Sequence, residues 1–570
     1  VADMGVRENF LSCLASMYWS TPMVVKNGRE QGPIVDSSIG VKQGDPLSPL
    51  LFGLFIDRVE AWLKERAPQC GVQLSGELLR VLLYADDLTL LASSPAELQA
   101  LLDALQAFCT VNSLHVNVAK SVVVVFGKRK PRVGREIPTT GWQFEGVQLP
   151  VVPEFRYLGI TFHQTRGVSA CTEALSAAAM RAMWGVLARC KTLEMPTIQL
   201  RMSLFDSIVT PILVYCSEVW GPTLLRSCSS PKKCLDLALH RPLFLFLRRL
   251  GGNLRRSTRR ELLLREFGAK PLARAWLRAS VQLWNRVAAI PDTDPLARAM
   301  CENLSLPGRT PQFWSVGFES FLCRIGALPE AGLVAEEGWA VLSVDKVLAA
   351  FDEWFAQGFQ GLPDDPRQAS SSAVSLCTYE RWFAVTPVEE GCGTGDWSAV
   401  PGYVSHTAGI PAWHVRSLAA FRLGAHHLEV ATGRWAGRPR PQRVCALCDC
   451  GVGDEFHMVF ECAAQAVPRQ MHAPLFAQFG GWEAASSDRS DLGADALRHF
   501  VAQDARLVAS FVHACELRAS AEPPDEVVFG DPLSETTDEF LECADDDVSD
   551  VISFALDAVL DVPGFFPCPP

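Results

Sequence analysis

The chain has 570 residues, of which 48% are hydrophobic and 20% are charged. This composition is typical of a globular protein with several domains, and it excludes a chain that is disordered throughout. The most apolar stretch, residues 204–225, contains two acidic residues and two prolines, so we expect it in a protein core and predict no membrane partner. The sequence opens with Val1 and has no secretory signal pattern, which predicts a fragment of an intracellular protein of the nucleus or cytoplasm.

The net charge of −12 is unevenly distributed along the chain. Residues 521–570 contain 14 acidic residues and no Lys or Arg, so the other 520 residues sum to +2. Residues 181–280 contain 18 Lys or Arg and only 6 Asp or Glu. A basic segment of this kind favours a polyanion as partner, although basic helices are also often only solvated faces. The acidic end is expected to be largely disordered, apart from a short helix at residues 551–560.

The first elements expected along the chain are a helix, a hairpin and a second helix. Apolar residues recur at helical spacing over residues 7–19. The hairpin is expected to turn at Asn27-Gly28, a dipeptide typical of two-residue hairpin loops. After a loop, a helix is expected from Pro46 or Ser48 to about Glu65.

Two adjacent aspartates, Asp86 and Asp87, are the clearest candidates for chemistry. They lie between two apolar runs that are typical of buried strands, so we expect them at or beside a hairpin turn. Aspartate is common in turns, but two like charges in an apolar setting cost free energy unless a partner offsets them. Hard oxygen ligands favour Mg²⁺, and two-ion phosphoryl transfer uses such carboxylates. The pair therefore predicts a catalytic Mg²⁺ site, with an ordinary turn as the alternative.

A helix and two more strands are expected after this pair. Ser94 followed by a proline and then Glu97 has the pattern of a capping box, which predicts a helix over residues 95–111. Residues 121–126 and 155–162 are each expected to form a strand, giving a mixed sheet with two or three helices packed on it. The chain is then expected to be helical to about residue 287, and helical in patches beyond it.

A compact group of cysteines and one histidine follows. Cys445, Cys448, His457 and Cys462 have spacings that suit one tetrahedral structural Zn²⁺. Cys450 is a possible substitute ligand, and four reduced core residues are the alternative to a metal site.

Four segments resemble, in order, the conserved boxes of reverse transcriptases. Residues 84–87 (YADD) resemble the box whose aspartates occupy a hairpin of the polymerase palm. Residues 40–57 (GVKQGDPLSPLLFGLFID) resemble the box that contacts the incoming nucleotide and the template. Residues 114–126 (LHVNVAKSVVVVF) and 156–159 (RYLG) resemble the next box and the primer-grip hairpin. On these motifs the chain is identified as a member of the non-LTR retrotransposon (LINE-type) reverse transcriptases.

The resemblance implies roles for individual residues. The implied catalytic residues are Asp86, Asp87 and Lys120, the implied substrate contacts are Gln43, Gly44, Tyr84 and Ala85, and the implied primer grip is Tyr157, Leu158 and Gly159. A lysine at position 120 would neutralise or protonate the departing pyrophosphate, with a surface lysine at a strand start as the alternative. Glycine at position 44 suits close approach of backbone to a nucleotide.

The basic segment follows the palm, where a thumb belongs in this family. Its candidate nucleic-acid contacts are Arg248, Arg249, Arg255, Arg256, Arg259 and Arg260. Such residues would track a template–primer backbone without reading its sequence. The residues around the Cys/His group resemble the C-terminal cysteine–histidine motif of the same elements, which implies a grip on nucleic acid without a catalytic role.

Together these expectations give an α+β fold: a polymerase palm with an antiparallel sheet and packed helices, then a helical thumb-like region, a helical connector and a small zinc-knuckle-like module. The expected domains are a palm (1–165), a basic thumb-like region (166–290), a connector (291–431), a Cys/His module (432–480) and a helical then acidic tail (481–570).

The resemblance implies an RNA-directed DNA polymerase that inserts a copy of its own element's RNA by target priming. Its partners would be an RNA template, a DNA primer or target, and deoxynucleoside triphosphates. A further catalytic aspartate of the family, and the fingers, are expected upstream of Val1, so this chain alone is expected to have little or no activity. The alternative is a catalytically dead or domesticated remnant that binds nucleic acid.

Overall fold

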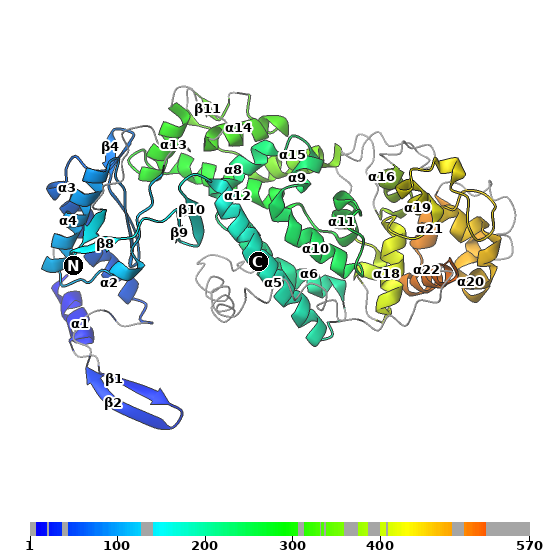
Figure 1. The fold of residues 1–570 in the computed structure, drawn as a ribbon, viewed down its shortest axis with the longest axis horizontal. Coiled ribbons are helices and arrows are strands. Elements are labelled where there is room, and N and C mark those ends of the chain that lie inside the picture. The colour runs from blue at the N-terminus through cyan, green and yellow to red at the C-terminus, as the bar shows by residue number, and fades with distance from the viewer. Residues whose placement is uncertain are drawn as a thin grey trace. The chain divides into compact units, whose positions relative to one another are not determined.

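The computed structural model describes two compact units that are treated separately (Figure 1). Unit 1 comprises residues 1–170 and 290–307, and unit 2 comprises residues 171–289 and 308–570. The described residues are 7–19, 22–36, 41, 44–126, 141–195, 197–305, 313–330, 332–335, 338–357, 374–385, 399–405, 409–481 and 495–519. The expected acidic tail with its helix at residues 551–560 lies outside them, as does Gln43. Every helix within them is too short or too polar to cross a membrane.

Unit 1 combines short hairpins with a few helices, which confirms the expected mixture of helices and antiparallel strands. Its helices are α1 (Glu8–Tyr18), α2 (Ser48–Ile56), α3 (Arg58–Arg66), α4 (Pro95–Val111), the 3₁₀ turn η2 (Val118–Lys120) and α13 (Pro295–Ser305). Its strands are β1 (Pro22–Asn27), β2 (Glu30–Asp36), β3 (Val72–Leu74), β4 (Glu77–Leu79), β5 (Val81–Tyr84), β6 (Asp87–Leu90), β7 (Trp142–Phe144), β8 (Val147–Leu149), β9 (Glu154–Tyr157) and β10 (Ile160–His163). Each strand pairs antiparallel with its neighbour in sequence.

Four expectations about unit 1 need correction. The strands form separate two-stranded sheets among the described residues, so the expected single mixed sheet is wrong for that part of the chain. Residues 121–126 make only one parallel bridge, between Val123 and Val151, because the facing segment runs alongside them for a single residue. Residues 155–162 form the β9–β10 hairpin rather than one strand. The helix expected to reach Glu65 is two helices, α2 and α3, that meet at Asp57.

The core of unit 1 lies between α3, α4 and the β7–β8 hairpin. Leu63, Leu101 and Phe108 are almost completely buried there, together with Trp142 and Phe144. Burial of side chains of this size stabilises the fold by about 1.5–3 kcal/mol each.

The predicted capping box starts α4 and also fixes the preceding loops. The backbone N–H of Glu97 donates to the Ser94 hydroxyl at 3.3 Å, as the box requires. One carboxylate oxygen of Glu97 accepts hydrogen bonds from the backbone N–H of Ser93 and from that of Gly71, both at 3.2 Å.

Helix α13 rejoins unit 1 from far along the chain. The backbone N–H of Ser75, in the β3–β4 turn, donates to the Glu302 carboxylate at 2.7 Å. The Ser75 hydroxyl donates to the carbonyl of Arg298 at 2.9 Å. The first helix of the predicted connector therefore packs on the expected palm, which no local sequence pattern indicated.

Unit 2 is mainly helical, as expected for residues 169–287 and for the patches beyond. Its elements are α5 (Val168–Thr192), α6 (Ile198–Ile208), α7 (Thr210–Val214), α8 (Ser217–Ser227), α9 (Pro231–Leu235), η3 (Ala238–His240), α10 (Arg241–Leu250), α11 (Arg260–Phe267), α12 (Leu272–Ala289), α14 (Trp314–Arg324), β11 (Val334–Ala335), β12 (Gly338–Trp339), α15 (Val344–Ala356), α16 (Val374–Thr378), η6 (Tyr379–Phe383), α17 (Gly402–Ser405), α18 (Ala412–Arg422), α19 (Glu429–Trp435), η7 (Arg440–Gln442), η8 (His457–Glu461), η9 (Ala463–Gln465), α20 (Ala466–Met471), η10 (Ala473–Phe479), α21 (Ala496–Val501) and α22 (Ala505–Ala519). The tryptophans of α8 and α12, Trp220 and Trp276, pack edge to face at 5.4 Å.

A fully buried carboxylate joins four of these elements. Glu266 on α11 accepts from the hydroxyls of Tyr379 at 2.7 Å and Tyr403 at 2.6 Å. It also accepts from Nε of Arg422, at the end of α18, at 2.7 Å. Burial lowers the pKa of Arg422, but the facing carboxylate of Glu266 outweighs burial and raises it. The two charges therefore neutralise each other inside the unit.

We predict that Glu266→Ala lowers the free energy of unfolding of unit 2 by about 3–5 kcal/mol, because Arg422 stays buried without its partner. The matched control is Asp236→Ala, which removes a largely exposed partner of Arg260 and should cost about 0–1 kcal/mol. Urea denaturation followed by tryptophan fluorescence measures both. Equal midpoints for the two variants would contradict the prediction.

Candidate functional site

The two aspartates lie at the tip of the β5–β6 hairpin, as the sequence predicts. Tyr84 pairs with Asp87 as the last pair of the ladder, so Ala85 and Asp86 form the turn. Ala85 has a φ of 49°, a left-handed conformation that costs a non-glycine residue about 1 kcal/mol. Strained backbone of this kind is concentrated at functional sites.

Only one face of this hairpin is covered, which corrects the expectation of two buried strands. Val81 is buried, and Leu83 and Leu88 pack against the core of unit 1. Asp86 and Asp87 are exposed. Buried carboxylates would need a cation to offset their loss of hydration, but these two carboxylates are exposed and have no such need. The prediction of a metal site therefore depends only on the presence of two adjacent, solvent-exposed oxygen ligands.

The segment before α2 is held by a contact that sequence reasoning missed. One carboxylate oxygen of Asp45 accepts from the Tyr18 hydroxyl at 2.8 Å, and the other accepts from the backbone N–H of Leu47 at 3.0 Å. This contact ties the end of α1 to the start of α2. Gly44 beside it has a φ of 84°, and a side chain added there would meet no atom of the described residues within 4 Å.

The two other predicted palm features lie on short turns. Lys120 is exposed at the end of η2, where its backbone N–H donates to the side chain of Asn117 at 3.3 Å. Leu158 and Gly159 form the β9–β10 turn with φ values of 47° and 78°. Two central residues with positive φ match the twist of a tight hairpin, which explains the need for glycine. The roles of Lys120 and of residues 157–159 stay predictions.

Arg248 and Arg249 lie at the end of α10, Arg255, Arg256 and Arg259 lie in the loop before α11, and Arg260 is the first residue of α11. Arg248 is partly buried and donates to the carbonyls of Arg256 at 3.3 Å and Thr258 at 3.4 Å, so it holds the loop. Burial lowers the pKa of Arg248, and the nearby Arg260 and Arg256 lower it further. Arg249, Arg259 and Arg260 contact Asn253, Glu261 and Asp236, respectively. Arg256 is exposed.

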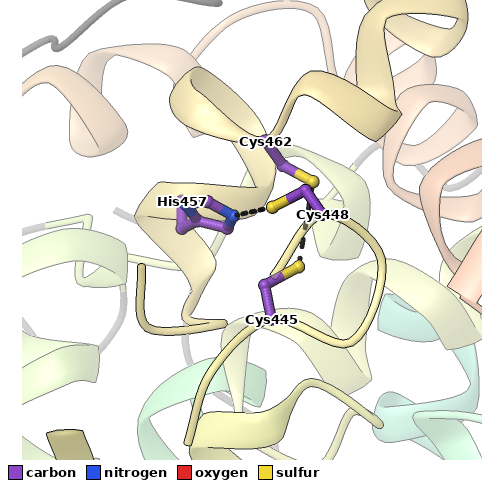
Figure 2. Close-up of side chains that lie close together, drawn as sticks. All are labelled: Cys445, Cys448, His457 and Cys462. Atoms are coloured by element: carbon purple, nitrogen blue, oxygen red, sulfur yellow. Dashed lines mark hydrogen bonds between the residues drawn. The ribbon is translucent and has the colours of Figure 1, made fainter. Parts of the chain in front are cut away.

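The four predicted zinc ligands converge in unit 2. Their ligand atoms all lie within 4.8 Å of one another, and Figure 2 shows their side chains directed at a common point. The Sγ atoms of Cys445 and Cys462 are 3.8 Å apart, and Sγ of Cys448 lies 3.2 Å from Nε2 of His457. Cys450 is exposed and is not a member of this group.

Local backbone geometry explains how these four residues meet. Val444 bridges to Val452, and Asp449 with a φ of 54° and Gly451 with a φ of 73° turn the intervening loop, which places Cys445 and Cys448 together. The backbone N–H of Cys462 donates to the carbonyl of His457 at 2.8 Å across five residues. This π-type turn aligns two side chains that a regular α-helix would separate.

The surroundings orient the histidine and favour an ionised thiol. Nδ1 of His457 lies 3.1 Å from the carboxylate of Glu461, which leaves Nε2 directed at the sulfur atoms. Burial alone would raise the pKa of Cys462, but hydrogen bonds from His457 and Cys448 outweigh it and lower the pKa to about 7. Burial lowers the pKa of His457, but its hydrogen bonds to Cys462, Glu461 and Cys448 outweigh burial and raise it to about 11, while burial raises the pKa of Cys448 to about 11. A metal ion would replace these protons, because a tetrahedral site requires thiolates and a neutral, oriented imidazole.

The hairpin carboxylates and the order of the boxes are typical of reverse transcriptases. The family profile described as "Reverse transcriptase (RNA-dependent DNA polymerase)" matches residues 2–162. This part of the chain is therefore a domain of the reverse transcriptase family, and the chain is similar to Pol polyproteins of retrotransposable elements, which supports the resemblance to the non-LTR (LINE-type) enzymes.

Three of those relatives are Pol polyproteins of R2 retrotransposable elements. The chain is 32% identical over 244 residues to the "Retrovirus-related Pol polyprotein from type-1 retrotransposable element R2" of Popillia japonica, covering 39% of the chain and 32% of that protein. It is 32% identical over 129 residues to the type-2 R2DM polyprotein of Drosophila melanogaster, covering 22% of the chain and 12% of that protein. It is 34% identical over 139 residues to the type-1 R2 polyprotein of Nasonia vitripennis, covering 24% of the chain and 13% of that protein. The chain thus spans a third or less of these relatives.

Proposed function

We propose that this chain contributes the catalytic hairpin and nucleic-acid-binding regions of an RNA-directed DNA polymerase that extends a DNA primer on an RNA template. The observation that carries the proposal is the exposed Asp86-Asp87 pair at a hairpin tip in a chain of the reverse transcriptase family. The domain division expected from the sequence, with a palm over residues 1–165, is part of the proposal. The end of the first segment of unit 1 at residue 170 supports it.

The proposed chemistry assigns one task to each group of residues. Asp86 and Asp87 would hold Mg²⁺, which when bound stabilises the attacking and leaving oxygens of phosphoryl transfer. The missing side chain of Gly44, which has a φ of 84°, would let the backbone approach the nucleotide closely. Lys120 would donate a proton to the departing pyrophosphate, and the β9–β10 turn would hold the primer end.

We predict that Asp87→Asn reduces primer extension at least about 100-fold, because one of the carboxylates that hold the cations is lost. The measurement is extension of a DNA primer on an RNA template with Mg²⁺, using the protein from the whole reading frame that contains this chain. The control is Asp103→Asn, an exposed aspartate of α4, which should extend like the parent. Template binding should be unchanged in both variants.

Two results would overturn the polymerase proposal. Extension that survives Asp87→Asn would exclude the hairpin as the catalytic site. No extension by the folded, template-binding parent would favour the nucleic-acid-binding remnant.

The Cys/His group is proposed to hold one structural Zn²⁺. Ligands about 2.3 Å from a tetrahedral zinc ion lie about 3.8 Å from one another, and the Cys445–Cys462 sulfur separation is 3.8 Å. Glu461 would keep the imidazole of His457 in the orientation that the ion needs. The ion would fix the loop of residues 445–451 to η8.

We predict about one Zn²⁺ per chain in protein purified without added metal, as measured by plasma mass spectrometry. Cys445→Ser should abolish this content, because three ligands do not complete the tetrahedron. Glu461→Gln should weaken zinc affinity by about 10–100-fold in a chelator competition. Cys450→Ser is the matched control and should retain the metal. Loss of zinc from Cys450→Ser, or retention of zinc by Cys445→Ser, would contradict the assignment of these ligands.

A further inference from the structure

The loop between α10 and α11 packs closely on α18 in unit 2. Gly252 in this loop has a φ of 79°, and a Cβ atom added to it would lie only 2.6 Å from Cβ of Arg416. Glycine is therefore required both by its backbone angle and by the close approach. The packing brings a loop of the basic segment against a helix that lies about 160 residues further along the chain.

The same loop reaches the segment that leads to the Cys/His group. Nη2 of Arg255 lies 3.3 Å from Nδ1 of His427. Since a guanidinium can only donate, Nδ1 accepts and Nε2 carries the imidazole proton. Burial lowers the pKa of His427, and Arg255, His426 and Arg416 lower it further. The ring therefore presents its Nε2–H as a hydrogen-bond donor.

Two arginines and a histidine are exposed in the segments that these contacts join. They are Arg256, next to Arg255 in the loop, Arg416 on α18, and His427, which Arg255 contacts. Two carboxylates lie close to this region: Glu455 binds His426 at 2.8 Å, and the half-buried Glu516 interacts with Ser417, His426 and Arg416, although burial raises its pKa. Like charges held together at a surface favour the binding of an anion.

An exposed tryptophan lies on the same helix as Arg416. Trp413 is 54% exposed, although tryptophan has one of the largest apolar surfaces that a side chain can bury. It precedes Arg416 by three residues on α18, so the two side chains share one face of the helix. A flat aromatic ring next to cations is the combination that holds unpaired bases and their phosphates.

We propose that Trp413, Arg416, Arg256 and His427 form a binding site for single-stranded nucleic acid. The cations and the His427 N–H would bind successive phosphates, and a base would stack on Trp413. Stacking requires an uncovered base, so the site would discriminate against a duplex, in which both faces of each base are covered. The inference rests on the proposed function, because it assigns to one surface the unpaired strand that such a polymerase handles.

The test is fluorescence anisotropy with a labelled oligonucleotide of about 16 residues, given as single-stranded RNA, single-stranded DNA or the matching duplex. Trp413→Ala should weaken single-strand binding about five-fold or more, while duplex binding stays within about two-fold. Trp413→Phe should retain most of the affinity. Arg416→Ala should reduce the slope of log affinity against log salt by about 0.7 for a single strand. Arg286→Ala, an exposed arginine of α12, is the control and should bind like the parent.

Single-strand affinity that is unchanged in Trp413→Ala, or lost equally for the duplex, would overturn the site. An unchanged salt slope in Arg416→Ala would also overturn it. An effect confined to RNA or to DNA would support the site and identify the strand. Because the assay contains neither Mg²⁺ nor nucleotides, its result is independent of primer extension, and either proposal can fail alone.

Discussion

The ion pair between Glu266 and Arg422 is the contact on which the arrangement of unit 2 depends. Glu266 lies on α11, directly after the basic loop, and Arg422 ends the helix that begins next to Trp413. A buried pair of opposite charges is stable only when its geometry is maintained, so the two helices are fixed relative to each other. Tyr379 and Tyr403 complete the partners of the carboxylate and bring η6 and α17 to the same point. The close packing of Gly252 on Arg416, and the gathering of cations beside it, follow from this fixed geometry.

Contacts between residues that are close in the sequence could be predicted, and contacts between distant residues could not. The capping box at Ser94 and Glu97, the β1–β2 hairpin and the Cys/His spacing are local patterns whose partners lie within about twenty residues, and the structure has all three. The hairpin turns at Gly28-Arg29, one residue after the expected Asn27-Gly28, because Asn27 pairs with Glu30. Two other contacts join residues more than 100 positions apart. Helix α13 contacts the β3–β4 turn, and α18 contacts the basic loop. No periodicity or spacing encodes such contacts, because they depend on how whole elements pack.

The errors in unit 1 have physical causes of the same kind. The β-branched run at residues 121–126 has the composition of a strand, but a strand exists only where a partner pairs with it, and its partner provides one bridge at Val151. The apolar runs around Asp86 and Asp87 were expected to be buried on both faces. The alternation of a hairpin instead directs Leu83 and Leu88 inward, while Leu82 is 39% exposed. Composition alone cannot distinguish one covered face from two.

The exposure of the hairpin tip bears on how a metal site is best recognised. A buried carboxylate pair implies a cation because of the energy of desolvation, whereas an exposed pair is stable without one. An active site that receives its cations together with a charged substrate must keep its ligands open to solvent, and the substrate phosphates supply the remaining oxygens. The Cys/His group is the opposite case, since Cys445 and Cys462 are buried and a thiol with a lowered pKa stays inside the protein more readily when an ion neutralises it. If both proposals hold, the hairpin would bind an exchangeable ion and the cysteines a permanent one.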